Sequence, residues 1–232
     1  MIEFVNVTKS YPNGDVVIDN LNLNISPGEF VVITGKSGAG KTTLGRLLIR
    51  DVLPSKGKIV IDGEDLTKIK AKEVPLLRRK IGFIFQNFKI IQDKTIGENI
   101  GIALEISGFN PRKISEKIAR LLDTVGIPNK QNLFPMQLAG GEIQRTSIAR
   151  AIAADPQILF ADEPTGNLDK ETTIEIFDLL KKINSDGTTV IMATHDVTVI
   201  DLNKARHIHL NKGKIISDTG AKKPKPNENR SK

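Results

Sequence analysis

Short apolar runs along this chain alternate with longer segments in which apolar residues recur every three or four positions. Runs rich in valine, isoleucine and phenylalanine are typical of strands that are buried on both faces, as in parallel sheets. Segments with the wider spacing, such as 44–48, predict helices that bury one face. The runs that predict strands are Phe30–Thr34, Lys58–Asp62, Ile81–Phe85, Ile158–Glu163 and Thr188–Thr194. This alternation predicts an α/β fold with a mainly parallel, right-handed core.

The first 25 residues follow a looser alternation, which predicts a small antiparallel β layer. Met1–Val7 is expected to form an edge strand of this layer. The cluster Tyr11–Gly14 contains the pair Asn-Gly, which is typical of a hairpin turn. The β pattern continues beyond the turn through Val16–Ile18 and Leu21–Ile25, so we expect the chain to open with a hairpin.

Strand signals fade from Asn87 to about Ala154, and helical periodicity replaces them. The apolar residues that share one helix face there are Ile114, Ile118, Leu121, Leu122 and Val125. This pattern predicts a helical subdomain of about 87–154 inserted into the α/β core. Near the end of the chain, His207–Leu210 and Lys214–Ser217 predict a closing β pair. We therefore expect one domain over residues 1–220.

The composition is that of an ordinary globular protein, with 39% hydrophobic and 26% charged residues. The chain holds no run of 18 apolar residues, so no membrane span is expected. Its first residues, MIEFVNVTKSY, lack the apolar stretch of a signal peptide, and the expected location is the cytosol. The absence of cysteine excludes disulfides, thiol catalysis and Cys-ligated zinc.

The formal charge of +7 is concentrated at the end of the chain. The stretch Ala221–Lys232 carries five basic residues and one acidic residue, Glu228, so it supplies +4 and the rest of the chain +3. A body of such low charge does not suggest specific binding to nucleic acid. We expect the tail to be disordered, and either solvated or in contact with anionic lipid.

The stretch Gly35–Thr42, GKSGAGKT, fits the phosphate-binding loop pattern G-x-x-x-x-G-K-[ST] at every fixed position. Its glycines let backbone N–H groups curl around an anion, Lys41 brings a positive charge to the phosphates, and the Thr42 hydroxyl can bind Mg²⁺. The alternative is a glycine-rich turn with a surface lysine, but the flanking strand and helix favour the phosphate site. The candidate nucleotide-binding residues here are Gly35, Lys36, Ser37, Gly38, Ala39, Gly40, Lys41, Thr42 and Thr43.

Polar residues stand at the ends of three other predicted strands. Ligands of α/β sheets bind past the carboxyl ends of strands, so Gln86 is a candidate contact. Asp162 can bind Mg²⁺ through water, and Glu163 can polarise an attacking water. His195 can reach a γ-phosphate. The alternatives are a capping glutamine, two solvated acids and a histidine that satisfies a local hydrogen bond.

Two further features have a functional and a purely structural interpretation. The stretch Leu138–Glu142, LAGGE, places two glycines before a helix expected from about Ile143 through Arg150, which makes a second potential anion site. Its alternative is an ordinary glycine-rich loop. Tyr11 is the only tyrosine of the chain and could stack on a base; its alternative is local packing in the turn.

Taken in order, these motifs resemble those of the ATP-binding cassette ATPases, and the resemblance covers the chain from about Ile2 to Gly220. It implies that one ATP is bound by Tyr11, by the phosphate loop (Walker A, with Thr43) and by Gln86. It also implies that Leu138, Ala139, Gly140, Gly141 and Glu142 form the signature motif, with Asp162 ending Walker B and Asp169 as the D-loop aspartate. The implied catalytic residues are Glu163, His195 and Lys41, and the implied Mg²⁺ ligands are Thr42, Gln86 and Asp162.

The resemblance further implies a head-to-tail homodimer that sandwiches two ATP molecules between the Walker A loop of one subunit and the signature of the other. Within the family, the chain most resembles the cell-division branch, whose members work with the integral membrane protein FtsX. The stretches that carry this likeness are Gly82–Lys89, Asp93–Thr95, Glu98–Asn99 and Glu163–Asp169, the last of which is shared with lipoprotein-release and macrolide-export ATPases. Such a chain is expected on the inner face of the membrane. An ATPase of a lipoprotein-release or macrolide-export transporter is the alternative.

The signature departs from the usual pattern, because Ala139 stands where most members have serine. That hydroxyl would reach the γ-phosphate held by the opposite subunit, so weaker ATP-driven dimerisation and slower hydrolysis are expected.

Two other classes of protein fit the sequence less well. DNA-repair and chromosome-organising cassette ATPases insert coiled coils or zinc modules between the Walker motifs, and 42–158 holds neither heptads nor cysteines. A phosphate-loop kinase would leave the signature stretch and His195 without a role.

Overall fold

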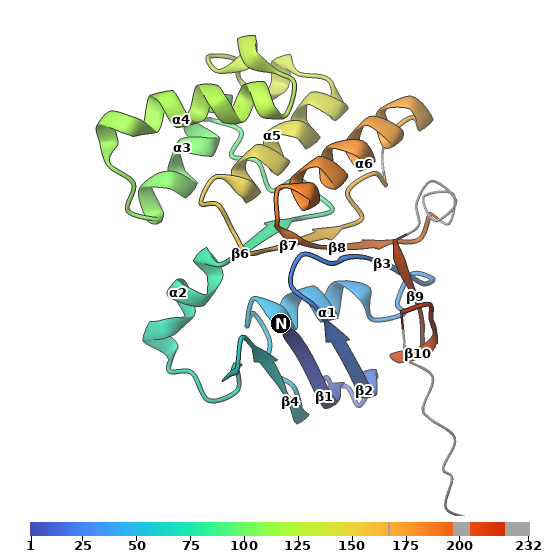
Figure 1. Cartoon of the computed structure of the whole chain (residues 1–232). Coiled ribbons are helices and arrows are strands. Elements are labelled where there is room, and N and C mark those ends of the chain that lie inside the picture. Colours follow the sequence, from blue (N-terminus) through green and yellow to red (C-terminus); the bar gives the residue numbers. More distant parts are fainter. Residues whose placement is uncertain (167, 197–204, 221–232) are drawn as a thin grey trace, which may run out of the picture.

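Two β-sheets with a helix between them, and further helices on one side, make up the computed structural model (Figure 1). It describes residues 1–166, 168–196 and 205–220. The tail Ala221–Lys232 and Asn167 of the D-loop stretch lie outside the described residues, so the division of the chain at 220 stays a prediction. The strands are β1 (Ile2–Ser10), β2 (Val16–Ile25), β3 (Phe30–Thr34), β4 (Lys56–Ile61), β5 (Glu64–Asp65), β6 (Ile81–Ile84), β7 (Ile158–Asp162), β8 (Thr189–Thr194), β9 (Arg206–Asn211) and β10 (Lys214–Asp218). The helices are α1 (Lys41–Leu48), α2 (Val74–Arg79), α3 (Ile96–Ile106), α4 (Pro111–Thr124), α5 (Gly140–Ile152) and α6 (Lys170–Ser185).

The larger sheet has the order β10-β9-β3-β8-β7-β6, and all its pairs except β9–β10 are parallel. The prediction of a mainly parallel core is therefore confirmed. Strand β3 lies between β8 and β9, so Val32 is opposite both Met192 and His207. Because parallel strands share one direction, the carboxyl ends of β3, β6, β7 and β8 meet at one edge of this sheet.

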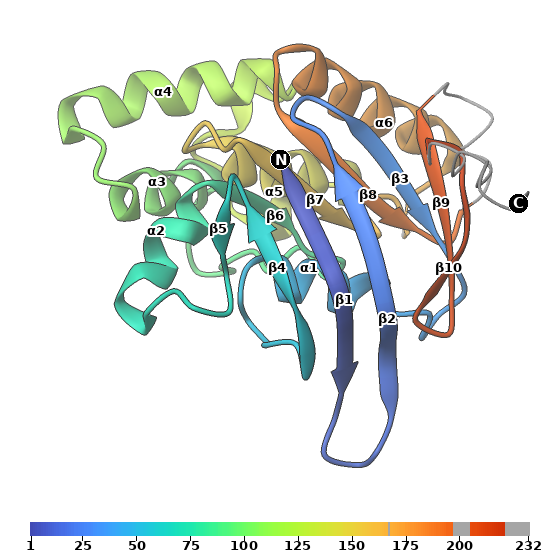
Figure 2. The same cartoon turned by 60° about the horizontal axis from the view of Figure 1, so that its bottom comes forward.

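The smaller sheet is antiparallel and has the order β2-β1-β4-β5 (Figure 2). The predicted hairpin is confirmed, and Gly14 closes its turn with φ of 88° and a 2.9 Å hydrogen bond from its N–H to the Tyr11 carbonyl. The prediction that Met1–Val7 is an edge strand is wrong. Strand β4 pairs with the side of β1 opposite β2, so β1 lies inside the sheet, and its side chains Ile2, Phe4 and Val7 are buried.

Helix α1 lies between the two sheets, where its predicted apolar face, Leu44, Leu47 and Leu48, is buried at 1% exposure for each side chain. Its close approach to β7 depends on Gly45, because a Cβ atom there would lie 2.5 Å from the Phe160 ring. The phosphate loop that precedes α1 is thereby held at the edge of the parallel sheet.

Helices α3, α4 and α5 occupy 96–152, within the predicted helical region, and cover the opposite side of the parallel sheet together with α6 (Figure 1). Helix α5 begins at Gly140 rather than at the predicted Ile143, because the Glu142 carboxylate accepts the Ala139 N–H at 3.0 Å and closes the first turn early. The short elements α2 and β5 have no counterpart in the predicted elements. None of the helices in the described ranges has the length and apolarity that a membrane crossing requires.

Candidate functional site

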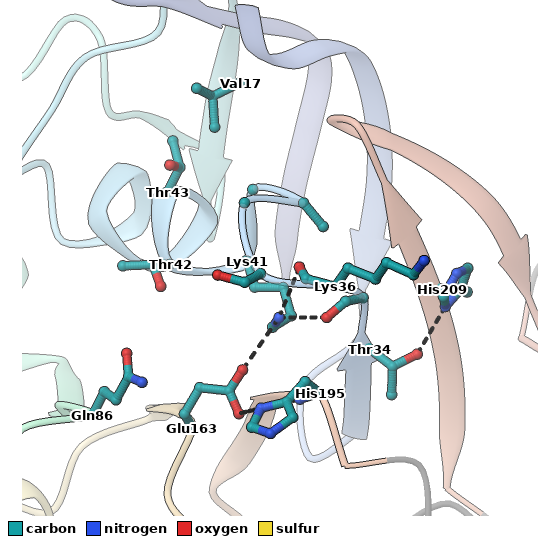
Figure 3. A pocket seen from close by; sticks show the side chains of 15 residues that line it. Val17, Thr34, Lys36, Lys41, Thr42, Thr43, Gln86, Glu163, His195 and His209 are labelled. Carbon is teal, nitrogen blue, oxygen red and sulfur yellow. Dashed lines mark hydrogen bonds and ion pairs between the residues drawn. The ribbon is translucent and has the colours of Figure 1, made fainter. Parts of the chain in front are cut away.

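A cavity of about 770 Å³ opens at the carboxyl edge of the parallel sheet (Figure 3). It is lined by Val17, Thr34, the whole stretch from Gly35 to Thr43, Gln86, Glu163, His195 and His209. The loops after β3, β6, β7 and β8 therefore bring together the predicted phosphate loop and the polar residues that follow the other strands. A volume of this size is in the usual range for small-molecule sites.

The phosphate loop has the backbone that its glycines predict. Gly38 and Gly40 have φ of 77° and 108°, a region that side chains with a Cβ avoid. The loop is braced from outside by the β9–β10 hairpin, because the Gly213 N–H donates to the Ala39 carbonyl at 3.0 Å. A Cβ at Gly35 would lie 2.3 Å from the Leu210 carbonyl oxygen, so the hairpin packs directly against the backbone of the loop.

Lys41, Glu163 and His195 form one connected group inside the cavity (Figure 3). The Lys41 ammonium lies 3.2 Å from Glu163 Oε1 and donates to the Gly35 carbonyl at 2.6 Å. The other carboxylate oxygen, Oε2, accepts the backbone N–H of His195 at 3.1 Å and lies 2.8 Å from its ring Nδ1. Lys41 and Glu163 are 6% and 8% exposed, whereas the His195 side chain is 62% exposed. Glu163 is thus held at both oxygens, and its backbone φ of 49° is strained for a non-glycine residue.

Thr42 and Asp162 form a second polar pair. The Thr42 hydroxyl donates to Asp162 Oδ1 at 3.1 Å across the space between α1 and β7. Burial raises the pKa of the Asp162 carboxyl, and the nearby Glu163 charge acts in the same direction, while Thr42 and Lys41 oppose them.

The donor set of Thr42, Asp162 and Gln86 suits a divalent cation only if a bound phosphate ligand supplies further oxygen donors. The described residues contain no cluster of three His, Asp or Glu side chains that could hold a metal ion. Hydroxyl, carboxylate and amide oxygens of Thr42, Asp162 and Gln86 are hard donors, which suit Mg²⁺ when phosphate oxygens and waters complete its coordination.

Four of the sequence-predicted features do not line this cavity. Asp162 lines a neighbouring cavity, which it shares with Thr42. Tyr11 lies in the turn beyond β1, where the Lys9 ammonium is 5.1 Å from its ring centre. Asp169 caps α6, and its carboxylate accepts the Thr172 N–H at 2.9 Å. The signature glycines open α5 beside that cap, since a Cβ at Gly141 would lie 2.8 Å from the Thr172 methyl group. One chain therefore contains the phosphate cavity and the signature motif as separate sites.

Sequence reasoning missed Thr34, His207 and His209. The Thr34 hydroxyl lies 2.6 Å from His207 Nε2 and 3.1 Å from His209 Nδ1, and burial lowers the pKa of His207. The sequence contains a pattern that places the two histidines on one face of a strand, because they alternate with the buried Ile208 and Leu210 along β9. Only the parallel pairing of β9 with β3 brings them beside the phosphate loop.

Comparisons with known proteins agree with this geometry. A protein-family model described as ABC transporter matches residues 18–166. The chain is 46% identical over 218 residues to the cell division ATP-binding protein FtsE of Bacillus subtilis (strain 168), and the match covers 94% of this chain and 96% of the relative. It is 42% identical over 220 residues to the protein of the same name from Escherichia coli (strain K12), with 95% and 99% covered. Among solved structures, a dimeric post-hydrolysis state of the ATP-binding cassette MJ0796 bound to ADP and Pi has a TM-score of 0.86 and 36% identity, covering 94% of this chain and 97% of that one.

Proposed function

Since this chain belongs to the ABC transporter ATPase family, we propose that it is the ATP-binding and ATP-hydrolysing subunit of a cell-division complex of the FtsE–FtsX type. The observation that carries the proposal is the Lys41–Glu163–His195 group within a phosphate-loop cavity of a chain that aligns with FtsE proteins along 94% of its length.

The geometry suggests how the catalytic side chains share the work. Lys41 binds the β- and γ-phosphates of ATP, so its ammonium has to exchange Glu163 Oε1 for phosphate oxygen. His195 retains Oε2 through its backbone N–H and ring, and Glu163 keeps its orientation while Oε1 becomes free to accept a proton from the attacking water. The exposed imidazole of His195 then lies where charge develops on the transferred phosphoryl group.

Mg²⁺ belongs to the same proposal. When bound, the ion neutralises phosphate charge and fixes the phosphate geometry. Thr42 and Asp162 would hold it from one side and Gln86 from the loop after β6. Their oxygen donors support this assignment, and we expect hydrolysis to depend on Mg²⁺.

A second copy of the chain completes the site in this proposal. The signature loop and the phosphate cavity are separate in one chain, and the MJ0796 cassette is described as dimeric. A head-to-tail homodimer would place each signature helix N-terminus over the ATP of the other subunit. Tyr11 would stack on adenine and Asp169 would lie at the dimer interface.

An FtsX-like integral membrane protein is the proposed partner, with the ATPase bound peripherally at the inner face of the membrane. The alternative is a subunit of a lipoprotein-release or macrolide-export transporter, for which the residue roles would be the same. No specific nucleic acid ligand is proposed, because the body of the chain carries little net charge.

The test is a pull-down of Glu163→Gln from native membranes with ATP and Mg²⁺. This substitution should lower turnover about 10²- to 10⁴-fold, the usual loss for a general base, while ATP stays bound and the dimer stays closed. Lys41→Gln is the matched control, since it should prevent the closed dimer.

Recovery of an FtsX-type protein with Glu163→Gln alone would support the proposal. Recovery of an export or lipoprotein-release permease would contradict the cell-division role and keep the ATPase. A monomer without any membrane partner would contradict the dimer mechanism.

A further inference from the structure

The turn that follows Gln86 has a strained backbone. Phe88 and Lys89 have φ of 52° and 51°, and neither is glycine. Contact between Cβ and the carbonyl oxygen disfavours this left-handed conformation, so two such residues in succession persist only where neighbouring groups hold them. Gln86 lines the nucleotide cavity (Figure 3), and the strained turn begins two residues after it.

The groups that hold the turn come from α5. Arg150 donates from Nη1 to the Lys89 carbonyl and from Nη2 to the Phe88 carbonyl, each at 2.8 Å. Ser147, which is fully buried on the same helix, donates to the Phe88 carbonyl at 3.4 Å. The planar fork of one guanidinium therefore binds both carbonyl groups of the strained turn.

Arg150 makes these bonds without an acidic partner. Burial lowers the pKa of its guanidinium, and within 1–166, 168–196 and 205–220 no carboxylate lies within ion-pair distance of it. The half-buried guanidinium of Arg150 therefore donates its hydrogen bonds to the two turn carbonyls. Displacing the turn would leave the charge of Arg150 without these acceptors.

Helix α5 connects this turn to the signature motif. It begins at Gly140, the first signature glycine, and Arg150 lies near its other end. Gln144 lies between them at 1% exposure, and neither polar atom of its side chain has a hydrogen-bond partner among the described residues. The Gln144 side chain therefore forms no hydrogen bond that would tie the middle of α5 to the elements around it.

Building on the proposed ATPase function, we propose that Arg150 is a positioning residue that couples the nucleotide cavity to the signature motif. It fixes the left-handed turn at Phe88 and Lys89 and so places Gln86 in the cavity. It also transmits any displacement of that turn along α5 to Gly140, where the second ATP of the dimer is bound.

The test compares Arg150→Gln with Arg150→Lys in purified protein. For Arg150→Gln, we expect KM for ATP within about twofold of the unsubstituted chain and kcat lower by about tenfold, the scale of a residue that acts through coupling. In the Glu163→Gln background, the ATP-driven dimer measured by sedimentation should weaken in parallel. Arg150→Lys should be intermediate, because an ammonium reaches one of the two carbonyls.

Arg78 supplies a matched control. Its guanidinium also binds two successive carbonyls, of Ile49 at 3.0 Å and Arg50 at 3.5 Å, at the end of α1. Arg78→Gln should lower Tm as Arg150→Gln does and leave kcat unchanged. Lys89→Gly, which tolerates positive φ and keeps the carbonyl, should restore part of the kcat lost in Arg150→Gln.

Equal losses of Tm for the two arginine variants with unchanged kcat would overturn the coupling role, and so would failure of Lys89→Gly to restore any kcat. If the unsubstituted chain hydrolyses no ATP, the proposed ATPase function is wrong. Measuring ATP hydrolysis by the unsubstituted chain therefore distinguishes failure of the proposed function from failure of the coupling role of Arg150.

Discussion

Asp162 is a charged side chain that the fold buries at the end of β7, 4% exposed, with a neighbouring carboxylate at Glu163. Its burial opposes ionisation, so the charged form destabilises the folded protein unless the proposed Mg²⁺ offsets that cost. Sequence reasoning identified Asp162, Glu163 and Lys41 because motif spacing marks them without knowledge of the fold. It missed Thr34 and His209, because their position depends on a pairing between strands far apart in sequence.

Asp162→Asn should stabilise the protein at neutral pH in the absence of ATP and Mg²⁺. The pKa of Asp162 is raised in the folded state, so its protonated form favours folding. This contribution to stability is fully present below the unfolded pKa, about 4, and is lost as pH rises through the folded pKa. Asparagine avoids that loss and still accepts from Thr42. Melting curves should therefore show a higher Tm for Asp162→Asn at pH 7 and a smaller difference at pH 4. A difference that grows toward low pH would contradict this assignment.

Helix α5 shows what a local pattern can and cannot predict. Apolar periodicity predicts this helix but places its start three residues late, because the contact of Glu142 with Ala139 closes a first turn that contains two glycines. Helix α2 was missed because it spans only Val74–Arg79, too short for apolar periodicity to be evident.

Ala139→Ser is the prediction that belongs to this element. Ala139 is the N-cap of α5, and no side chain there accepts from the first turn. Serine should raise the stability of the monomer by roughly 0.5–2 kcal/mol as a cap. In the dimer, a hydroxyl bonded to the γ-phosphate should contribute about 1.5–3 kcal/mol, which corresponds to tighter ATP-driven dimerisation by about tenfold or more.

Sedimentation with ATP in the Glu163→Gln background, and urea unfolding without ATP, separate the two effects. Unchanged dimerisation and turnover after Ala139→Ser would show that the missing hydroxyl has no influence on either.

Gly45→Ala tests the packing of α1. The added Cβ would lie 2.5 Å from the Phe160 ring, so α1 has to move away from β7, at a cost of about 1–3 kcal/mol in unfolding free energy. Gly101→Ala on α3 is the control, because its Cβ would meet Ile118 at an ordinary 3.5 Å. Urea denaturation should show a loss for Gly45→Ala and no loss for Gly101→Ala. Equal effects would mean that the Phe160 contact is easily relieved.

The whole molecule consists of two sheets packed around α1. The local sequence pattern predicts this fold class, but it does not predict which strands pair with one another. The sequence indicates five runs with the character of parallel strands, and the structure confirms four of them. The fifth, Lys58–Asp62, corresponds to β4 and pairs antiparallel with β1. The sequence does not indicate that β4 pairs with β1, which turns a predicted edge strand into an inner one, because strand order is decided by contacts between distant segments.

At this scale, the proposed dimer predicts complementation between two inactive variants. Lys41→Gln damages the phosphate cavity, and Gly140→Asp places a carboxylate at the signature. The Gly140 site can accept a side chain in the monomer, since its Cβ would meet Leu168 at 3.8 Å. An equal mixture forms heterodimers with one intact site, so ATPase activity should recover to roughly a quarter of the unsubstituted level, as two-fold symmetry requires. A mixture as inactive as its components would contradict a shared site.

The position of β3 between β8 and β9 has a consequence for synthesis of the chain. The phosphate loop follows β3 directly, yet both neighbours of that strand come from the last third of the sequence. At about 5–20 residues per second, a ribosome needs roughly ten to thirty seconds between β3 and β8. During that interval an apolar strand with two unpaired edges is exposed beside the nascent hairpin. Chains released early would therefore lack a phosphate site and depend on chaperones or proteases for their removal.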